Sequence, residues 1–450
     1  MKEDSIEAFR QAPVPVLVWK NTVPAIAAMI LVMVYNLADT FFIGKTGNPY
    51  MVAAVSLAMP VYLLFMAVGN IFGAGGTSMI SRSFGKGNWR EAAEISAFCF
   101  WGCLAVSLLM TAGLLAFMDP LLYTMGASDD TFAYARIYLV IVTVSGPLVT
   151  FSNCFGSIIR TEGRAVKAMM GMLLGNLLNV ALDPFFILVL DWGTAGAAAA
   201  TAVSNGVSAI YYALYLSRED TRLSIHYRSL ALRQETVQGV LSIGIPAALG
   251  DMLMSFSQII ANGQLAAYGD LAVAGYGVAS KITMMTGMMS IGFGQGIQPV
   301  LGYCTGSGDR KRFRSVLRFS LISSSCLSLG MTLVCWIFTG ELVHQFLSDK
   351  DAYSYAFRFA RILLTTGFLF GIFYVLTSTL QAMGKGTEAL IANVSRQGLI
   401  FIPALFLFSN RLGMDGILWA QPVADLLSLL LVAYLCWEVI QRKGYERNTI

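Results

Sequence analysis

Four polar residues in the first half of the chain have the types and spacing of a cation site. Asp39 lies in the segment YNLADTFFIG, Asn179 and Asp183 lie four residues apart in LLNVALDP, and Thr201 follows an alanine run. Oxygen atoms of this kind bind protons or hard cations such as Na⁺. Each residue lies in a long apolar stretch, and a carboxylate at mid-bilayer costs about 2.5–3.5 kcal/mol on insertion scales. Such residues are candidates for function.

Three asparagines extend this set along the same helix faces. They precede Asp39 and Asn179 by three residues and follow Thr201 by four, and residues three or four apart are neighbours on a helix. We expect them to act as supporting ligands, and they are Asn36, Asn176 and Asn205.

The ligands are also expected at one depth. Asp39 and Asp183 lie eight residues before Gly47 and Asp191, and Thr201 lies eight residues after Gly193, three positions at the outer ends of their helices. At 1.5 Å per helical residue this is about 12 Å. In the alternative interpretation each polar residue only packs against a neighbouring helix. That alternative leaves two carboxylates at one level without a basic partner.

The elements that position these residues are membrane-spanning helices. Hydrophobic residues make up 56% of the 450-residue chain, charged residues make up 12%, and the mean hydropathy is +0.66. Soluble globular chains have about 45–50% apolar and about 25% charged residues. We therefore expect an all-α integral membrane protein with twelve transmembrane helices. The predicted spans are 16–44, 51–81, 93–117, 131–152, 168–190, 195–216, 237–266, 271–303, 316–338, 354–380, 388–408 and 413–437.

The chain contains an internal repeat of half its length. FGAGGTSMISRSFGKGNWREA at 72–92 reappears in degenerate form as FGQGIQPVLGYCTGSGDRKRF at 293–313, an offset of 221. RTEGRA at 160–165 falls on QAMGKG at 381–386 with the same offset. A single long period predicts two homologous six-helix bundles. Because six is even, the bundles are expected to be parallel repeats, a common plan of secondary transporters.

The predicted domains are an N-terminal lobe at 1–216, a linker at 217–235 and a C-terminal lobe at 236–450. Most of the 30 Lys and Arg residues lie in segments on one side of the predicted helices, which places both termini in the cytoplasm. The same pattern makes these charges topology signals, and no nucleic-acid partner is expected. The charged linker, with few leucines, is expected on the cytoplasmic membrane surface.

The second half lacks the first-half ligands. Ala261 stands where Asp39 would repeat, Pro403 or Ala404 stands in place of Asp183, and Gln421 in place of Thr201. Its own intramembrane charges are Asp251, Lys281, Arg396 and Asp425. For Arg396 and Asp425 two interpretations stay open, a neutralising ion pair and a direct role in substrate binding or gating.

The segment KITMMTGMM at 281–289 is rich in methionine, a side chain that suits adaptable binding surfaces and also fills ordinary helix cores. The candidates for lining a substrate cavity are Gln258, Asn262, Met285, Met288 and Asp425.

Motifs for catalysis are absent from the sequence. The two histidines, His226 and His344, lie in the linker and in a predicted outer loop, with no HExxH motif and no GxxxxGK[ST] phosphate loop. The seven cysteines lie in or beside the spans and are expected to be reduced and packed. We therefore expect no enzyme activity and no cofactor other than a coupling H⁺ or Na⁺.

Several segments resemble the multidrug and toxic compound extrusion (MATE) family over nearly the whole length. They are YNLADTFFIG, RSFGKGNWREA, RTEGRAVKAMMGMLLGNLLNVALDPFFIL and SRQGLIFIP. The last pattern resembles the DinF- and MepA-type bacterial branches more than the NorM branch. So does the seventh span, where Asp251 does not stand at the position of the NorM-type acid. In similar members an N-lobe cation site uses an aspartate, an asparagine–aspartate pair and a threonine. The matching positions here are Asp39, Asn179, Asp183 and Thr201.

The resemblance implies a cation-coupled antiporter that exports amphipathic or cationic organic compounds in exchange for H⁺ or Na⁺. Its partners would be small drug-like molecules and the lipid bilayer, and it would work as a monomer in the cytoplasmic (inner) membrane of a bacterium or archaeon. The alternative is a lipid-linked saccharide flippase of the same superfamily. Such flippases tend to have fourteen spans and cationic cavities, whereas this chain has twelve predicted spans and two intramembrane basic residues.

Overall fold

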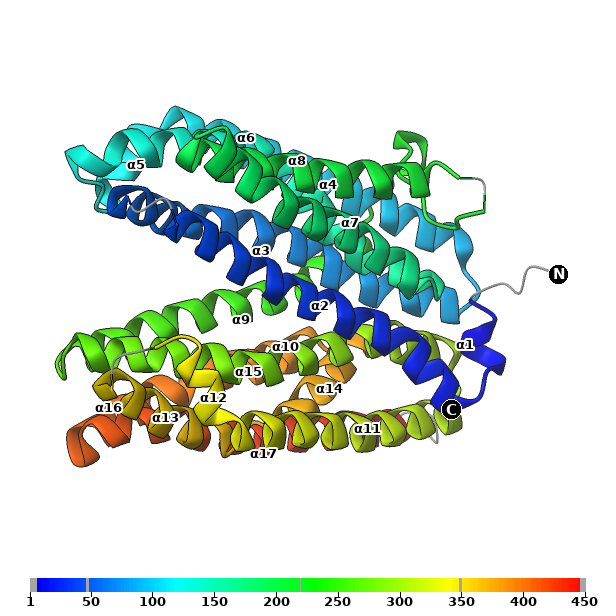
Figure 1. The fold of residues 1–450 in the computed structure, drawn as a ribbon. Helices are drawn as coiled ribbons and strands as arrows, with labels where there is room; N and C mark the ends of the chain where they lie inside the picture. The colour runs from blue at the N-terminus through cyan, green and yellow to red at the C-terminus, as the bar shows by residue number, and fades with distance from the viewer. Residues whose placement is uncertain (1–5, 46–47, 219, 348–349, 446–450) are drawn as a thin grey trace. The chain divides into compact units, whose positions relative to one another are not determined.

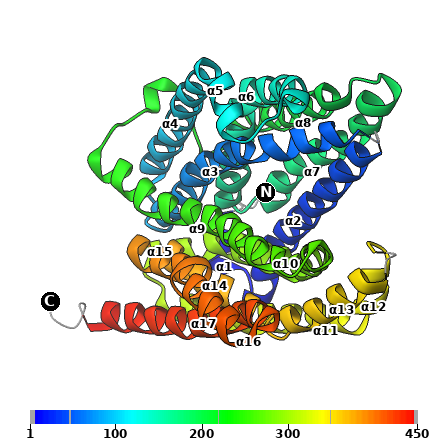
Figure 2. The ribbon, with the colours of Figure 1, turned by 90° about the vertical axis from the view of Figure 1, so that its left-hand side faces the viewer.

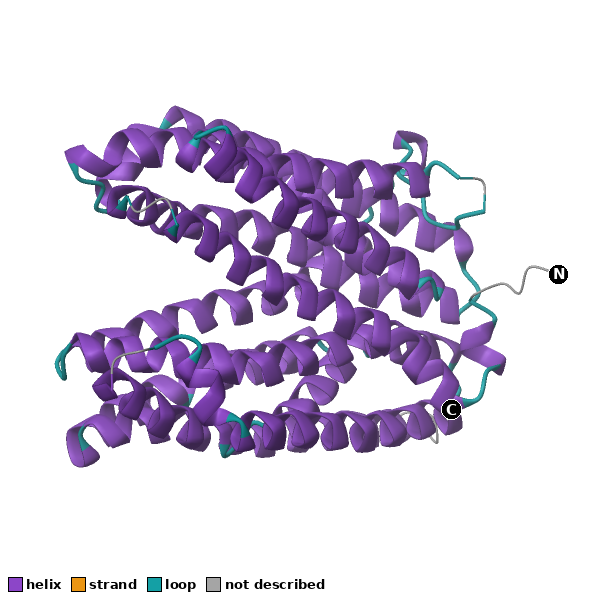
Figure 3. Ribbon diagram, in the orientation of Figure 1, coloured by secondary structure: helices purple, strands orange, loops and turns teal. Residues whose placement is uncertain are grey.

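A computed structural model gives the fold and describes residues 6–45, 48–218, 220–347 and 350–445. A few side chains within these ranges are outside the description, namely those of Asn36, Asp39, Thr40, Ile43, Gly44, Pro49, Lys350 and residues 442–445. Helices are the only regular elements in the described ranges (Figure 3). The chain divides into two compact units. Unit 1 comprises Met1–Gln11 and Ala27–Ala248, and unit 2 comprises Ala12–Ile26 and Leu249–Ile450.

Unit 1 is built from long helices that run between its two ends (Figure 1). Its elements are α1 (Ala8–Gln11), the later part of α2 (Val14–Gly44), α3 (Pro49–Gly85), α4 (Trp89–Ala116), α5 (Met118–Thr124), α6 (Asp129–Ile158), η1 (Ile159–Glu162), α7 (Ala165–Pro184), η2 (Phe185–Val189), α8 (Gly193–Leu216), η3 (Tyr227–Ser229) and the first part of α9 (Gln234–Ala266). An apolar core around Phe65, Leu122 and Leu139 joins α3, α5 and α6.

Unit 2 repeats this plan with more broken helices. Its elements are the first part of α2, the later part of α9, α10 (Asp270–Ser307), α11 (Arg310–Ile337), α12 (Thr339–His344), α13 (Lys350–Leu364), α14 (Leu369–Ala382), α15 (Gly386–Val394), η4 (Ser395–Leu399), α16 (Phe401–Leu412) and α17 (Met414–Tyr445). Helix α14 packs against α10, α15 and α17 (Figure 2). The apolar core includes Phe359 and Phe401.

Among the described residues, nine helices are long and apolar enough to cross a membrane. Helices α13 and α14 meet the same criteria together and bend by 51° at a short break, so they make a tenth span if the pair is counted as one. Helices α8 and α10 complete the twelve helices that the sequence predicts, with 24 and 38 residues. Both are rich in small or polar residues, which lowers their hydropathy without shortening them.

Helices α2 and α9 are each divided between the two units, because the first segment of each helix belongs to one unit and its later part to the other. Residues 14–26 of α2 belong to unit 2, and residues 234–248 of α9 belong to unit 1. The compact units therefore differ from the two halves of the sequence, which would assign each of these helices to one lobe. Cutting the chain at 217–235 would separate the start of α9 from the α3 surface on which it packs.

Repeated glycines make this division of α2 and α9 possible. A Cβ atom at Gly75 in α3 would lie 2.1 Å from the carbonyl oxygen of Val240 in α9. At Gly296 in α10, the repeat of Gly75, a Cβ atom would lie 2.7 Å from the carbonyl oxygen of Asn21 in α2. Small residues allow helix backbones to approach this closely. The repeated glycine thus serves the same contact once in each unit.

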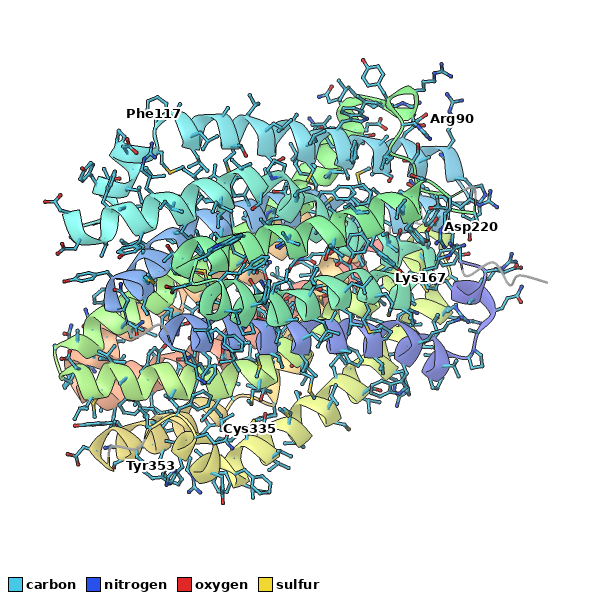
Figure 4. All side chains as sticks on the ribbon, turned by 45° about the horizontal axis from the view of Figure 1, so that its top comes forward. Arg90, Phe117, Lys167, Asp220, Cys335 and Tyr353 are labelled. Atoms are coloured by element: carbon cyan, nitrogen blue, oxygen red, sulfur yellow. The ribbon has the colours of Figure 1, made fainter. Side chains whose placement is uncertain are left out.

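The linker after α8 folds against unit 1. Buried Glu162 accepts hydrogen bonds from the Tyr215 hydroxyl, from Thr221 Oγ1 at 2.9 Å and from the Arg222 backbone N–H at 2.5 Å. Arg164 forms an ion pair with Asp220 at 3.1 Å. Arg90, Lys167 and Asp220 lie at this end of unit 1, and Phe117 lies at the other end (Figure 4). In its described residues this segment has one short helical turn, η3, and the polar contacts hold it against the rest of unit 1.

The close approach of α9 to α3 predicts the effect of adding a side chain at Gly244. A Cβ atom there would lie 1.9 Å from the Ile71 carbonyl oxygen, so Gly244→Val must push the two helices apart. We expect a loss of roughly 1–3 kcal/mol or more, seen as a lower Tm of the purified protein. Gly263→Val is the control, because a Cβ atom at that position of α9 meets nothing within 4 Å. Equal Tm values for both variants would contradict this packing.

Candidate cation site and charged cluster

The candidate cation site lies on the interface between α7 and α8 of unit 1. These helices are antiparallel, with the Tyr212 hydroxyl donating to the Ala168 carbonyl at 2.7 Å and Ser208 Oγ donating to the Gly171 carbonyl at 2.9 Å. Further along, a Cβ atom at Gly196 would lie 2.8 Å from the Phe186 carbonyl oxygen. Glycine at these contacts brings the two helices close together, and Asn179 of α7 meets Thr201 of α8 between them.

The structure brings three of the predicted ligands onto this interface. Asn179 Nδ2 lies 3.5 Å from Thr201 Oγ1, at the long end of hydrogen-bond distance. Asp183 follows Asn179 by one helical turn and is completely buried at 0% exposure. Asn179 and Thr201 are 2% and 4% exposed. An acid, an amide and a hydroxyl are therefore gathered inside an apolar bundle.

Several polar atoms around this site have no hydrogen-bond partner in the described part of the chain. They include Asn179 Oδ1, Asn176 Nδ2 and Ser204 Oγ. A buried polar atom left unsatisfied costs about 1–3 kcal/mol. A cation held by Asp183, Asn179 and Thr201 would satisfy the amide oxygen, so the donor set fits H⁺ or Na⁺. Ser204 is a residue that the sequence reasoning missed. Its position three residues after Thr201 was the available signal.

Four further ligands are predicted in the first half, and the structure describes the side chains of two of them. The side chains of Asn36 and Asp39 lie outside the described residues. Asn205 Nδ2 donates to the Thr201 backbone carbonyl at 2.9 Å, so this side chain is bound to its own helix. Asn176 is partly buried on the α7 face that also carries Asn179.

A π-helical turn follows the acid. Residues Phe185–Val189 form η2 directly after Pro184, with the Leu190 N–H bonded to the Phe185 carbonyl at 2.9 Å. Proline has no N–H and disrupts the regular helical hydrogen bonds around it. Asp183 thus stands at the last regular turn of α7, where the helix changes its pitch.

Unit 2 contains a buried ion pair, and we call it with its neighbours the Arg396 cluster. Arg396 Nε donates to Asp425 Oδ1 at 2.8 Å, and the side chains are 8% and 2% exposed. Two neutral groups also donate to the carboxylate, Gln421 Nε2 at 2.9 Å and Thr366 Oγ1 at 3.0 Å. The first of the two interpretations from the sequence, a neutralising pair, is therefore present in the structure.

Aromatic rings enclose the guanidinium of this cluster. The Arg396 Cζ atom lies 4.4 Å from the ring centroid of Phe370, 5.1 Å from that of Phe373 and 5.5 Å from that of Tyr374. Arg396 Nη1 also donates to the Tyr374 hydroxyl at 3.0 Å. Cations within about 6 Å of a ring centroid are attracted to the ring face. The rings belong to α14, the arginine to η4 and the acid to α17.

The other candidates in unit 2 are distributed over α9 and α10. Gln258 and Asn262 are partly buried on α9, and Asn262 Oδ1 has no hydrogen-bond partner among the described groups. Met285 packs against the apolar core of unit 2, and Met288 is partly buried nearby on α10. The two other charges that the sequence places inside the membrane in this half are exposed: Asp251 on α9, and Lys281 on α10, whose Nζ atom lies 5.7 Å from the Phe346 ring centroid.

The comparison with protein families matches the chain twice. The family model for MatE covers residues 24–185 and 246–407, two stretches displaced by 246 − 24 = 222 residues. This double match confirms the internal repeat. Together the stretches cover more than half of the chain.

Relatives align over almost the full length. The multidrug export protein MepA of Staphylococcus aureus (strain MSSA476) is 28% identical over 438 residues, covering 97% of both chains. The protein of that name from Staphylococcus haemolyticus (strain JCSC1435) is 28% identical over 450 residues, covering 100% of this chain and 99% of its own.

Solved structures share the fold. A MOP superfamily transporter from Pyrococcus furiosus Vc1 (DSM3638) superposes with a TM-score of 0.92 at 23% identity, covering 98% of this chain and 99% of its own. A crystal structure of MATE in the straight conformation gives a TM-score of 0.93 at 23% identity with the same coverage. At this identity the likeness establishes the fold, and the double family match establishes the relationship. The chain belongs to the MatE family of membrane transporters.

Proposed function

We propose that this protein is a secondary active multidrug efflux transporter that exports amphipathic or cationic organic compounds in exchange for H⁺ or Na⁺. The observation that carries the proposal is the buried group of Asp183, Asn179 and Thr201 between α7 and α8. Buried oxygen ligands of this kind have a cost in stability that a bound cation offsets. A transporter needs such a reversible site for its coupling ion.

The proposed mechanism is competition between two ligands for two conformations. A cation bound at Asp183, with Asp39 contributing from the sequence pattern, favours one of the inward-open and outward-open states. The organic substrate favours the other. A ligand shifts such an equilibrium only by its difference in affinity for the two states. One charge moved through 100 mV supplies about 2.3 kcal/mol, enough for roughly 50-fold accumulation.

Relatives support efflux over the alternative of a lipid-linked saccharide flippase. The Staphylococcus proteins that align with 97% or more of this chain are named as multidrug export proteins. We further propose the cytoplasmic membrane as the location, with both termini in the cytoplasm, and the monomer as the working unit. The basic residues near the predicted cytoplasmic ends of the helices support this orientation.

The first prediction concerns the acid. Asp183→Asn should abolish gradient-driven efflux of a cationic dye while the protein still inserts, because an amide cannot exchange a proton and has no charge for Na⁺. Asp39→Asn should behave in the same way. The assay uses inverted membrane vesicles and applies a proton gradient and a sodium gradient separately, which also identifies the coupling ion.

Asp191→Asn is the matched control for these variants. Asp191 is exposed, eight residues beyond Asp183, and has φ of 53°, a conformation that asparagine also tolerates. It should transport normally. Gradient-driven efflux by Asp183→Asn at the rate of this control would refute the coupling role.

The second prediction separates the neutral ligands from the acids. Asn179→Ala and Thr201→Ala should each weaken the apparent affinity for the coupling cation by roughly threefold to tenfold, because a neutral oxygen contributes about 0.5–1.5 kcal/mol. The maximal rate should change less. Asn205→Ala should have a smaller effect, since its amide is bonded to its own helix. Initial rates measured against cation concentration test this order, and an inactive alanine variant beside an active Asp183→Asn would reverse the assignment.

A further inference from the structure

In the internal repeat, the Arg396 cluster of unit 2 falls close to the sequence positions equivalent to the candidate cation site of unit 1. With the offsets of the repeat, Gln421 corresponds to Thr201 and Asp425 to Asn205 at 220 residues, and Arg396 corresponds to residue 175 at 221. Residue 175 is a glycine whose Cβ would meet Ser208 Oγ at 2.1 Å. In unit 1 this position therefore has no side chain, whereas in unit 2 it carries a cation. Unit 2 thus carries a fixed positive charge close to the repeat position at which unit 1 has its candidate site for an exchangeable cation.

The surroundings of the guanidinium are those that would recognise an organic cation. A carboxylate accepts a hydrogen bond from it at 2.8 Å, and three ring centroids lie between 4.4 and 5.5 Å from its central carbon. Aromatic rings combined with an acid bind ammonium and guanidinium groups by cation–π attraction and charge. The neutral donors Gln421 and Thr366 hold the carboxylate in place through its other contacts.

Stability alone is a weak explanation for this pair. Replacing a buried ion pair by apolar residues of similar volume is often neutral or stabilising, because desolvation offsets the attraction. Much of unit 2 around the cluster is apolar, including buried Phe370 and Phe373. A second explanation is that the acid and rings are needed for a ligand, and that the arginine satisfies them when the ligand is absent.

The backbone that carries Arg396 gives a route for its withdrawal. Residues Ser395–Leu399 form the π turn η4, in which the Ile400 N–H bonds to the Ser395 carbonyl at 3.0 Å. A π turn contains one residue more than an α turn and often occurs at functional sites. If the π turn shifts along the helix by one residue, each side chain that it passes rotates about the helix axis through about 100°. Such a rotation would take the guanidinium away from Asp425.

We propose that the Arg396 cluster is a binding site for the head group of the exported organic cation, and that Arg396 fills this site as a tethered substitute cation. The inference rests on the proposed function, because it presumes that organic cations are the substrates. The substrate head would take the place of the guanidinium between Asp425 and the three rings. Arg396 is then an internal competitor of the substrate.

The test is equilibrium binding of tetraphenylphosphonium, a rigid lipophilic cation, to the purified full chain. An internal competitor that occupies its site for about nine-tenths of the time weakens apparent affinity by about tenfold. Arg396→Ala should therefore bind the probe about tenfold more tightly than the wild type. The double variant Arg396→Ala/Asp425→Asn should lose this gain.

Arg361→Ala is the matched control. The Arg361 Cζ atom also stacks on two rings in unit 2, at 4.4 Å from Trp336 and 4.5 Å from Phe357, and no ion pair described in the structure includes this residue. Its removal should leave the probe affinity unchanged. Arg396→Gln is measured in parallel, and binding is repeated in membranes from expressing cells, where a variant that is unstable in detergent can still be assayed.

Unchanged or weaker binding by both Arg396 variants would overturn the proposal, because a purely structural ion pair predicts that result. Tighter binding that persists in the double variant would also overturn it, since the gain would not depend on Asp425. This assay imposes no ion gradient. A negative binding result would therefore not contradict coupled efflux, and a loss of coupled efflux in vesicles would not change the binding result.

Discussion

The constraint on which the structure depends is the cost of burying polar groups inside apolar helices. In the described part of unit 1, Asp183, Asn179 and Thr201 are buried between α7 and α8, and the Asn179 amide oxygen has no protein partner. In unit 2, Asp425 receives three hydrogen bonds, one of them from a guanidinium. The two units thus offset the same cost in different ways. Unit 1 combines an acid with neutral ligands that suit an exchangeable cation, and unit 2 pairs its acid with a guanidinium that belongs to the chain.

This difference gives the two homologous units different roles in the proposed cycle. A site completed by a cation from solution responds to the concentration of that cation, and it can therefore couple transport to a gradient. A site completed by an arginine does not exchange its charge, and it can only be opened by moving the side chain. We accordingly assign ion coupling to unit 1 and substrate recognition to unit 2, as parts of the proposed function.

Much of this architecture could be predicted from the sequence because it follows from hydropathy and period. The twelve helices, the internal repeat and the apposition of Asn179 with Thr201 all rest on local spacing and on depth along helices. The division of α2 and α9 between the two units could not be predicted, because a glycine pattern indicates close helix packing but does not identify the helix that packs there. The π turns and the ring contacts of Arg396 depend on tertiary packing, which local spacing does not reveal. The side chain of Asp39 lies outside the described residues, and its role remains a prediction.

In the proposed function, binding of the coupling cation at Asp183 changes the affinity for the organic substrate. The most direct test measures the tetraphenylphosphonium affinity of the purified protein as pH and Na⁺ concentration are varied separately. Thermodynamic linkage is reciprocal. If the coupling cation weakens the binding of the substrate by a given factor, the substrate weakens the binding of the cation by the same factor. Coupling through Asp183 predicts this dependence in the wild type and in Arg396→Ala, and an affinity that no longer responds in Asp183→Asn. A response that survives in Asp183→Asn, or that disappears in Arg396→Ala, would contradict it.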